Sequence, residues 1–489
     1  MWFRGRTVLA FMVLTAIATG SIVYMVMSFP GLMSSSSEPR VSSPIVSGEQ
    51  GFTQNEFNKL NRAFEFIRKQ YYIDTKRSTL IDGAIQGMVE SLDDPYSIYK
   101  TEAEAEAFTD VLQGAFTGIG AELTSENGAI VVQSAIRSSP ADRAGLLSGD
   151  ELLSVNGQSL LGLSLVDAAT LIRGPKGTKA KLKVRRDGVS EPIDLELVRD
   201  RIDLETVHSE RTDDGIGYIA INQFTFDTAE QVSIELKALE KLGIHALVID
   251  VRDNPGGIVQ SVEAVAELFI VKGKPIMQVA HRSGKTVIET ADKGIAIAKP
   301  YPIIVLMNQG SASAAEILAG ALKQSAGAIL IGETTYGKGT VQVSNNEDLG
   351  DGSIIKLTVS KWLLPDGTWV NKIGIAPDIV VAQPEYFLAS QLPRDKVLKY
   401  DTTGDAVRNL QLILAGVGFP ADRQDGYFSI GTRIALKKFQ NEQVLPESGE
   451  VTRDTAQRLE EMLYAVIHNP LKDEQLQVAY EQARALINE

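Results

Sequence analysis

A lysine held between two glycines is the first residue of this sequence that could do chemistry. It is Lys338, in the stretch GETTYGKGT from Gly332 to Thr340. A phosphate-binding P-loop would place Ser or Thr after this lysine and continue into a helix, but Gly339 stands there and the following TVQVSNNEDLG predicts strands. The sequence therefore argues against a nucleotide site. A lysine becomes a general base when burial lowers the pKa of its ammonium group, and its usual companion is a hydroxyl nucleophile.

The candidate nucleophile is Ser313, in the stretch NQGSASAAE from Asn308 to Glu316. The apolar run IIVLM before this stretch predicts a strand, and a helix is expected to begin near Ser313. Backbone amides and the positive end of the helix dipole would then be available to a developing oxyanion. Ser313 and Glu316 also form a capping-box pattern, which opens many helices without catalysis. Ser311 is a second hydroxyl, but it ranks lower because it precedes the helix start.

A glycine-rich turn, DNPGG from Asp253 to Gly257, follows the apolar strand HALVIDV. Such a turn frees backbone N–H groups to point into a crevice, and α/β sheets bind ligands at the carboxyl ends of their strands. A plain loop is the alternative interpretation. Together with the serine and lysine segments, the turn places candidate chemistry after three successive strands. His245 opens the first of these strands and could act as a base for the serine, but the sequence favours a structural role for it.

Composition narrows the possible chemistry. The chain has 489 residues, enough for roughly three or four domains, and a formal net charge of −14. An acidic chain is a poor partner for nucleic acid. It contains no cysteine, and its four histidines are not spaced as metal ligands. We therefore expect no disulfide, no thiolate nucleophile and no protein-bound metal, and no motif of the chain implies a cofactor.

The N-terminus predicts a membrane anchor. Arg4 and Arg6 precede an uncharged run, residues 7–29, which is long enough to cross a hydrocarbon core of about 30 Å. Positive charge before the run places the N-terminus in the cytoplasm and the rest of the chain on the extracytoplasmic side. A cleaved signal peptide is the alternative, although its apolar region would be shorter. Residues 30–51 are rich in Ser and Pro and predict a flexible linker.

Patterns along the rest of the chain predict an α/β multidomain protein. Helical periodicity dominates residues 52–112, and short strands separated by turns dominate 113–199, which predicts an inserted, mostly-β module. Strands and helices alternate over 200–390, which predicts a layered α/β core with a partly parallel sheet. Residues 400–463 predict a small all-α domain, and residues 464–489 predict a polar helical tail.

Several segments resemble motifs of the carboxyl-terminal processing peptidases, also called tail-specific proteases. They are VIDVRDNPGG, NQGSASAAEILAGALK, GETTYGKGTVQ and LPDGTWVNKIGIAPDIVV. A further segment, LIDGAIQGMVESLDDPYSIY, resembles the helical region that precedes the binding module in that family. The resemblance covers residues 52–384 and implies a serine peptidase.

Residue by residue, the resemblance implies a Ser–Lys dyad. Ser313 matches the nucleophile, Lys338 the general base, and Gln342 the residue that orients the lysine amine. The residues that match the oxyanion-hole amides are Ala314 and Gly256, with Gly257 as the alternative to Gly256. Lys338 would take the Ser313 proton, the alkoxide would attack a peptide carbonyl, and the amides would stabilise the tetrahedral oxyanion.

The strand-rich region 113–199 resembles a PDZ domain, most clearly in SSPADRAGLLSGDELLSVNGQSL. In such a domain, backbone amides bind the terminal carboxylate of a peptide, which joins the sheet edge as a strand. The matching loop and strand residues are Gly118, Ile119, Gly120 and Ala121. Arg173, near the end of the module, is expected to couple peptide binding to the active site.

Region 400–463 resembles the small three-helix peptidoglycan-binding domain in VRNLQLILAGVGF, DGYFSIGTRIALKKFQ and SGEVTRDTAQRL. The resemblance to the peptidase family implies a homodimer formed through the N-terminal segment and the C-terminal tail. The sequence therefore predicts a membrane-anchored serine endopeptidase that recognises the free C-termini of cell-envelope proteins. Its partners would be such proteins or peptides, peptidoglycan and the membrane. The alternative is an inactive envelope scaffold that binds protein C-termini and peptidoglycan, but the intact Ser313, Lys338 and Gln342 argue against it.

Overall fold

The computed structural model describes residues 51–488, in two compact units that meet in sequence between Leu80 and Ile81. Some internal positions fall outside the description: 127, 137–138, 148, 164, 187–188, 190, 204, 346–347, 391 and 394–395. The predicted anchor at 7–29 and nearly all of the predicted linker at 30–51 also lie outside the described residues. Within the described part of the chain, no helix is both long and apolar enough to cross a membrane.

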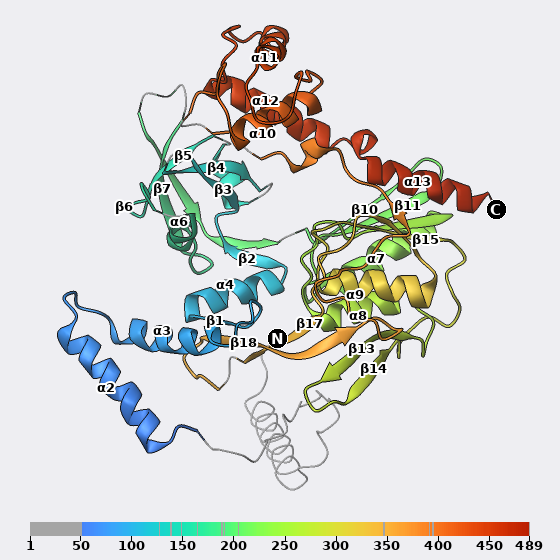
Figure 1. Cartoon of the computed structure of the whole chain (residues 1–489), viewed down its shortest axis with the longest axis horizontal. Coiled ribbons are helices and arrows are strands. Elements are labelled where there is room, and N and C mark those ends of the chain that lie inside the picture. The colour runs from blue at the N-terminus through green and yellow to red at the C-terminus, as the bar shows by residue number, and fades with distance from the viewer. Residues whose placement is uncertain are drawn as a thin grey trace, which may run out of the picture. The chain divides into compact units, whose positions relative to one another are not determined.

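The first unit contains helix α2 (Gln54–Gln70), drawn in blue in Figure 1. Thr53 caps its start: the Thr53 N–H donates to Glu56 Oε2 at 2.8 Å, and the Glu56 N–H donates to Thr53 Oγ1 at 3.4 Å. No residue of α2 is buried, and large apolar side chains such as Phe57 and Phe66 are exposed. Helix α3 (Arg77–Glu90) begins in this unit and ends in the next.

The central sheet of the second unit has six strands in the order β10-β11-β12-β15-β16-β19. Strand β10 is antiparallel to β11 and the other neighbours are parallel, which confirms the predicted partly parallel sheet. Every residue of β12 and β15 is buried, as expected for strands covered on both faces. The strands are β10 (Val207–Arg211), β11 (Ile216–Ile221), β12 (Ala246–Asp250), β15 (Ile303–Met307), β16 (Ile329–Gly332) and β19 (Ile379–Val380).

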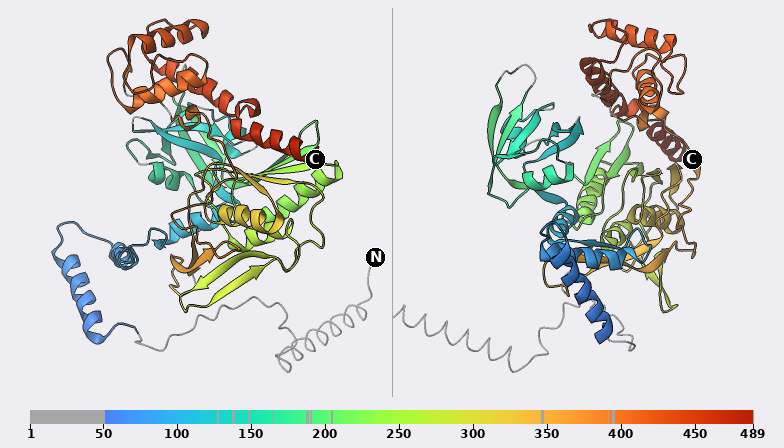
Figure 2. Two further views of the ribbon diagram at one scale, coloured as in Figure 1. Left: turned by 45° about the vertical axis from the view of Figure 1, so that its right-hand side comes forward. Right: turned by 60° about the vertical axis from the view of Figure 1, so that its left-hand side comes forward.

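Side chains of strand β12 alternate between two hydrophobic clusters. Leu247 and Ile249 join a cluster with helices α7, α8 and α9, whereas Ala246 and Val248 join a cluster with the C-terminal helix α13. The helices are α7 (Thr228–Lys241), α8 (Val259–Glu267), α9 (Ala314–Ala321) and α13 (Glu474–Ile487). Figure 2 shows α13 as the dark red helix at the C-terminus. The period-two alternation of strand side chains therefore gives the sheet two covered faces.

Helix α13 is part of the core although it is the last element of the chain. Its buried face consists of Leu476, Ala479, Tyr480 and Ala483. Its N-cap, Asp473, accepts hydrogen bonds from the Leu476 N–H at 2.9 Å and from Arg252 Nη2 at 2.8 Å. Arg252 also pairs with Asp250 at 2.6 Å, so a buried charged network ties the start of α13 to the carboxyl end of β12. The predicted polar tail thus has an apolar face, and that face packs on the sheet of its own chain.

A small all-α domain lies in the sequence between β19 and α13, which confirms that part of the predicted fold. Its helices are α10 (Asp405–Gly416), α11 (Ile430–Glu442) and α12 (Arg453–Ile467). They share a hydrophobic cluster in which Phe428 and Phe439 are fully buried. Phe419 meets Phe439 edge to face, with ring centroids 5.5 Å apart. Helix α12 continues past residue 463, where the sequence analysis ended the domain.

A second, antiparallel sheet contains the strand that directly follows the lysine loop. Strand β17 (Thr340–Asn345) pairs with β18 (Ile354–Leu363), and β18 also pairs with β1 (Ile98–Lys100) and with β13. The remaining strands are β13 (Pro275–His281) and β14 (Thr286–Thr290). Because a strand and not a helix follows Lys338, the structure excludes a P-loop at this lysine.

The mostly-β module has its own sheet, in the order β3-β4-β5-β7-β8 with β6 paired to β5. Helix α6 (Leu165–Ile172) packs against β3, and β2 (Ala115–Gly118) pairs with β9 (Asp200–Asp203) where the chain enters and leaves the module. Strand β3 stands at the end of the order, so its outer edge pairs with no other described strand. The strands of the sheet are β3 (Ala121–Glu126), β4 (Ala129–Ala135), β5 (Glu151–Val155), β6 (Gln158–Ser159), β7 (Lys179–Arg185) and β8 (Ile193–Val198).

Candidate active site

The three segments with candidate chemistry follow three neighbouring strands of the central sheet. Strands β12, β15 and β16 lie side by side and run parallel, so their carboxyl ends meet at one edge. The DNPGG turn follows β12, Ser313 follows β15, and Lys338 follows β16. Asn308 joins the first two loops: its Oδ1 accepts the Asp253 N–H, and its Nδ2 donates to Asp253 Oδ1, both at 2.9 Å. The structure therefore brings the predicted segments together.

Ser313 lies immediately before helix α9 in a strained backbone conformation. Its φ of 56° and ψ of −113° lie outside the regions that residues other than glycine commonly adopt. A sharp strand-to-helix turn of this kind presents its side chain at the edge of the sheet, and Ser313 is partly exposed. Ser311, by contrast, is buried, and its hydroxyl donates to Val251 O at 2.7 Å. This structural hydrogen bond makes Ser311 the poorer candidate.

The loop that carries Lys338 is held through its backbone. Trp362 Nε1 donates to Lys338 O, and Trp369 Nε1 donates to Gly339 O, both at 2.7 Å. A Cβ atom at position 339 would lie 2.6 Å from Trp369 Nε1, so no side chain fits there. Gly337 has a φ of 85°, and a Cβ atom there would lie 2.8–3.0 Å from backbone nitrogens of residues 372–374. The glycines on both sides of the lysine therefore allow close packing of the loop.

A buried carboxylate joins the serine turn to the lysine loop. Glu316 Oε2 accepts hydrogen bonds from the Ser313 N–H and the Lys338 N–H, both at 2.8 Å. These two backbone nitrogens are therefore at most about 5.6 Å apart, twice that distance. Glu316 Oε1 accepts from the Gly337 N–H at 2.8 Å and from the Thr335 hydroxyl at 2.6 Å. The capping-box spacing from Ser313 predicts only the helix-cap role of Glu316, and this second role has no signal in the sequence.

The Lys338 amine lies in a partly desolvated environment. Burial lowers the pKa of Lys338 to about 8, and the positive charge of Lys356 acts in the same direction. The carboxylates of Glu316 and Asp94 act against this shift. Lys338 Nζ lies 4.9 Å from the centroid of the Tyr96 ring. Neither Asp94 nor Tyr96 is among the site residues predicted from the sequence, although both belong to DDPYSIY, in the segment that resembles the region before the binding module.

Gln342 lies on β17, close to the lysine loop, but its amide is engaged elsewhere. Gln342 Nε2 donates to Thr340 Oγ1 at 2.9 Å and to Thr358 Oγ1 at 3.2 Å. Among the described contacts, Lys338 Nζ has no hydrogen bond to Ser313 Oγ or to Gln342. The role of Gln342 in orienting the lysine amine therefore stays a prediction.

The predicted oxyanion amides lie beside the serine. A Cβ atom added to Gly256 would lie 2.9 Å from Ser313 Cβ and 3.0 Å from Ala314 N, and Gly256 has a φ of 102°. Ala314 opens α9, so its N–H has no acceptor within the helix. The Gly256 N–H donates to Asn254 Oδ1 at 2.8 Å. Among the described hydrogen bonds the Gly257 N–H makes none, which keeps Gly257 as the alternative oxyanion donor.

His245 lies at the opposite end of β12 from the DNPGG turn, because it precedes the first residue of that strand. Its N–H donates to Gly215 O at 2.9 Å. A residue at the amino end of a parallel strand cannot reach a nucleophile at the carboxyl edge of the same sheet. This placement agrees with the structural, non-catalytic role that the sequence favours for His245.

The residues predicted to bind a peptide end line one small groove beside β3 and α6. Its volume is about 210 Å³. It is lined by Gly118, Ile119, Gly120 and Ala121 together with Phe116, Leu123, Ala169, Ile172 and Arg173. Arg173 Cζ lies 6.0 Å from the Phe116 ring centroid, so the proposed coupling residue belongs to the groove itself. Coupling through Arg173 stays a prediction.

Comparisons with known proteins identify the family. Two relatives from Bacillus subtilis (strain 168) are each 42% identical to this chain. For carboxy-terminal processing protease CtpB the alignment covers 86% of this chain and 88% of the relative. For carboxy-terminal processing protease CtpA it covers 83% of this chain and 86% of the relative. The solved photosystem II D1 C-terminal processing protease is 26% identical and covers 68% of this chain and 94% of its own, with a TM-score of 0.42. Family models match peptidase family S41 at 215–381, the activating protease CtpB N-terminal domain at 16–104, a PDZ domain at 131–186 and a peptidoglycan binding domain at 403–459.

The chain therefore belongs to the carboxy-terminal processing proteases of peptidase family S41. It is a serine-type C-terminal processing peptidase that carries a PDZ domain and a peptidoglycan binding domain. The predictions of the family, the enzyme class and the fold are confirmed, and the roles of individual site residues stay predictions.

If Lys338 is the base, peptide hydrolysis should increase as pH rises through about 8, because only the neutral amine accepts a proton. Lys356→Met removes a neighbouring positive charge, so the Lys338 pKa should rise and the acid limb of the rate–pH curve should move to higher pH. Lys361→Met, on the same strand β18, is the matched control. Initial rates measured from about pH 6 to about pH 10 check this. An acid limb of Lys356→Met that stays in place or moves down contradicts it.

Proposed function

We propose that this peptidase hydrolyses peptide bonds with a Ser–Lys dyad formed by Ser313 and Lys338. The observation that carries the proposal is the Glu316 carboxylate, whose Oε2 binds the backbone N–H groups of both residues. A lysine with a pKa of about 8 has an appreciable neutral fraction near neutral pH. Covalent acyl transfer needs the amine within hydrogen-bond reach of the serine hydroxyl, and the shared carboxylate already brings the two backbones close together.

In the proposed reaction, neutral Lys338 Nζ accepts the hydroxyl proton of Ser313 as Oγ attacks the carbonyl carbon of the substrate. The amides of Ala314 and of Gly256 or Gly257 stabilise the oxyanion. The Lys338 ammonium then gives its proton to the leaving amine, and an acyl-enzyme ester remains on Ser313. A water molecule that gives a proton to Lys338 then attacks this ester. The Lys338 ammonium passes that proton to the departing Ser313 Oγ, which releases the new C-terminus and restores the free serine and the neutral lysine.

We further propose that the PDZ domain selects substrates by their free C-terminus. Among the described hydrogen bonds, none is donated by the backbone N–H of Ile119 or Gly120, and the outer edge of β3 pairs with no described strand. A terminal carboxylate would accept hydrogen bonds from these amides while the last residues of the peptide extend the sheet. Leu123 and Ile172 in the groove favour an apolar C-terminal side chain.

The free-acid and C-terminally amidated forms of one unstructured peptide with an apolar last residue test this selection. The full-length protein should have a kcat/KM at least about tenfold higher for the free acid, because the amide loses the charge-assisted hydrogen bonds of the carboxylate. The difference should lie mainly in KM. Ser313→Ala protein, assayed in parallel, controls for contaminating proteases. Equal kcat/KM values would count against recognition of the C-terminus and would leave the Ser–Lys proposal intact.

Residues 7–29 are proposed to anchor the protein in a membrane, with cell-envelope proteins as its substrates. The support is the uncharged run that follows Arg4 and Arg6. Alkaline extraction of membranes from cells that produce the full chain should leave the protein in the pellet. Release into the supernatant would contradict an uncleaved anchor.

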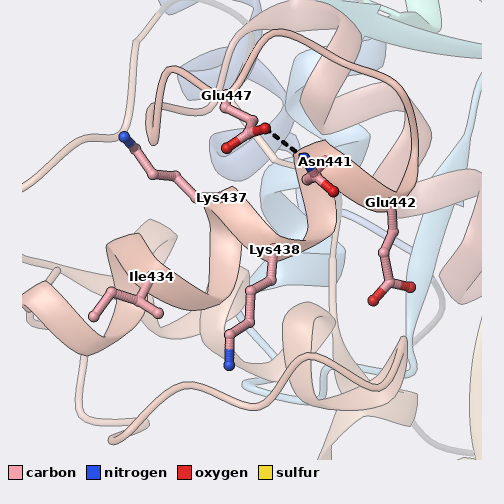
Figure 3. Close-up of a pocket in the computed structure, with 6 residues that line it drawn as sticks. All are labelled: Ile434, Lys437, Lys438, Asn441, Glu442 and Glu447. Atoms are coloured by element: carbon pink, nitrogen blue, oxygen red, sulfur yellow. Dashed lines mark hydrogen bonds between the residues drawn. The ribbon is translucent and has the colours of Figure 1, made fainter.

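Peptidoglycan is the proposed ligand of the C-terminal domain, on the strength of the family match at 403–459. A shallow pocket of about 310 Å³ on α11 is a candidate contact, lined by Ile434, Lys437, Lys438, Asn441, Glu442 and Glu447. Figure 3 shows the two lysine side chains pointing away from each other and Glu447 hydrogen-bonded to Asn441. If this pocket binds, a Lys437→Ala/Lys438→Ala variant should co-sediment less with insoluble peptidoglycan. Unchanged co-sedimentation would eliminate the pocket.

A homodimer is proposed through the N-terminal helices, because α2 exposes an apolar face that includes Phe57 and Leu60. The C-terminal helix is a weaker candidate, since its apolar face is already covered by the sheet of its own chain. Sedimentation velocity of the detergent-solubilised protein should give twice the chain mass, and Phe57→Ser/Leu60→Ser should give the chain mass. A monomeric wild type would contradict the dimer.

A further inference from the structure

The segment from Asp94 to Ser97, between α3 and β1, reaches the lysine from the N-terminal part of the chain. Strand β1 pairs antiparallel with β18, with Ile98 opposite Lys356. Strand β18 in turn pairs with β17, which begins directly after the lysine loop. In Figure 1 the label of β1 stands beside that of β18. The N-terminal region thus adds a strand to the sheet beside Lys338, and this pairing fixes where the four preceding residues lie.

These four residues form a tight turn around the Asp94 carboxylate. Asp94 Oδ2 accepts a hydrogen bond from the Ser97 hydroxyl at 2.6 Å, and Asp94 Oδ1 accepts from the Tyr96 N–H at 3.2 Å. Ser97 is buried, and its Oγ accepts from the Thr358 N–H at 3.1 Å. Thr358 Oγ1 accepts from Gln342 Nε2 at 3.2 Å. A continuous series of contacts therefore leads from Asp94 to Gln342.

The Tyr96 ring lies against the lysine amine, with its centroid 4.9 Å from Lys338 Nζ. A cation within about 6 Å of an aromatic centroid is attracted by the negative face of the ring. Among the described hydrogen bonds, Lys338 Nζ donates none, so the ring face is a main contact of the amine. The turn therefore contacts Lys338 through Tyr96, and through Ser97 it contacts Thr358, the hydrogen-bond partner of Gln342.

We propose that the Asp94–Ser97 turn positions the catalytic base. Tyr96 holds the Lys338 amine, and Ser97 supports strand β18, whose Thr358 accepts a hydrogen bond from Gln342. This inference rests on the proposed Ser–Lys function and adds positioning residues to it. The turn lies outside both the S41 match at 215–381 and the core predicted at 200–390. A turn that precedes the PDZ domain in the sequence would therefore belong to the active site.

The groups that face the lysine amine have opposing effects on the pKa of Lys338. They are Asp94 and Tyr96 from the turn, Lys356 from β18 and Glu316 from α9, and Tyr336 in the lysine loop contacts Tyr96. Asp94 and Glu316 favour the charged amine, and Lys356 disfavours it. The Tyr96 ring also favours the charged amine, and its hydroxyl stays protonated because burial and a hydrogen bond with Tyr336 raise the pKa of Tyr96 to about 12. Removal of the ring should therefore lower the pKa of the lysine.

The pH dependence of kcat/KM, measured on the full chain, tests the inference. Tyr96→Leu removes the ring and Tyr96→Phe keeps it, whereas Tyr99→Phe is a matched control on β1 because the Tyr99 hydroxyl donates to Asp82 Oδ1. We expect the acid limb to move down by about half to one pH unit in Tyr96→Leu and to stay in place in both Phe variants. Ser97→Ala should lower kcat by about tenfold with little change in KM, the effect of one lost positioning hydrogen bond.

An acid limb of Tyr96→Leu that matches wild type, or that moves to higher pH, overturns the role of Tyr96. If Tyr96→Leu does not fold, Asp94→Asn serves in its place, because the loss of that negative charge should also move the limb down. Wild-type kcat in Ser97→Ala overturns the role of Ser97. Failure of the Ser–Lys function itself would look different, because Lys338→Ala would then remain active.

Discussion

Hydrolysis of unfolded casein should fall by at least about 10³-fold when either Ser313 or Lys338 is replaced by alanine. Ser313→Ala removes the nucleophilic oxygen, and Lys338→Ala removes the base that takes its proton. Because the two groups act as a unit, the double variant should lose little more than either single variant. Initial rates of purified full-length proteins at about pH 9 check this, above the Lys338 pKa of about 8.

Lys323→Ala is the matched control for the lysine substitution. Lys323 is a half-buried lysine paired with Asp378 at 2.7 Å, and it should keep the wild-type rate when replaced. Equal rates for wild type, Ser313→Ala and Lys338→Ala would point to a contaminating protease or to another site. Binding of a free-acid peptide with no cleavage by the wild type would favour the inactive scaffold.

Replacing Glu316 with glutamine should lower kcat by about 10²-fold, although Glu316 is not expected to touch substrate. Its two oxygens accept hydrogen bonds from three backbone N–H groups and one hydroxyl. Glutamine offers one acceptor oxygen, and its NH₂ group would face backbone N–H donors. Each buried donor left without a partner costs about 1–3 kcal/mol, so the serine turn and the lysine loop should separate. The loss should appear in kcat more than in KM.

Glu240→Gln is the control for this substitution. Glu240 is a partly buried carboxylate with two strong contacts, since Oε1 binds Lys299 Nζ and the Tyr301 hydroxyl at 2.6 Å, but its helix α7 does not carry the site. Both variants should be assayed well below their thermal unfolding midpoints, so that activity is compared between folded proteins. A Glu316→Gln protein with wild-type kcat would show that the shared carboxylate is dispensable for the reaction.

The sheet edge could be predicted from the sequence because each loop has a local signal. An apolar strand precedes the DNPGG turn, Ser313 and Lys338, and the structure places β12, β15 and β16 side by side as expected. The role of Glu316 could not be predicted in the same way. Its spacing from Ser313 already has a complete local explanation as a helix cap. Its other partners lie 19 to 22 residues further along the chain, where only the tertiary fold brings them near.

Tyr96 and helix α13 differ in how clearly the sequence indicates their positions. The contact of Tyr96 with Lys338 depends on the pairing of Ile98 with Lys356, which joins distant segments and leaves no local pattern. Helix α13, in contrast, carries a readable signal. Its buried residues Leu476, Ala479, Tyr480 and Ala483 follow the three-and-four spacing of one helical face. The polar composition of the rest of the tail concealed this narrow apolar stripe.

The docking of α13 makes the peptidase core discontinuous in sequence, with the peptidoglycan binding domain spliced between β19 and the last helix. A stop codon after β19 would uncover Val248 and Ile304 on the sheet and would strip Arg252 of Asp473, so the shortened chain would not be a minimal protease. The peptidoglycan binding domain could therefore be exchanged only as an internal segment of the chain. A mechanical load on that domain would then pull on the helix that braces the strand leading into the DNPGG turn.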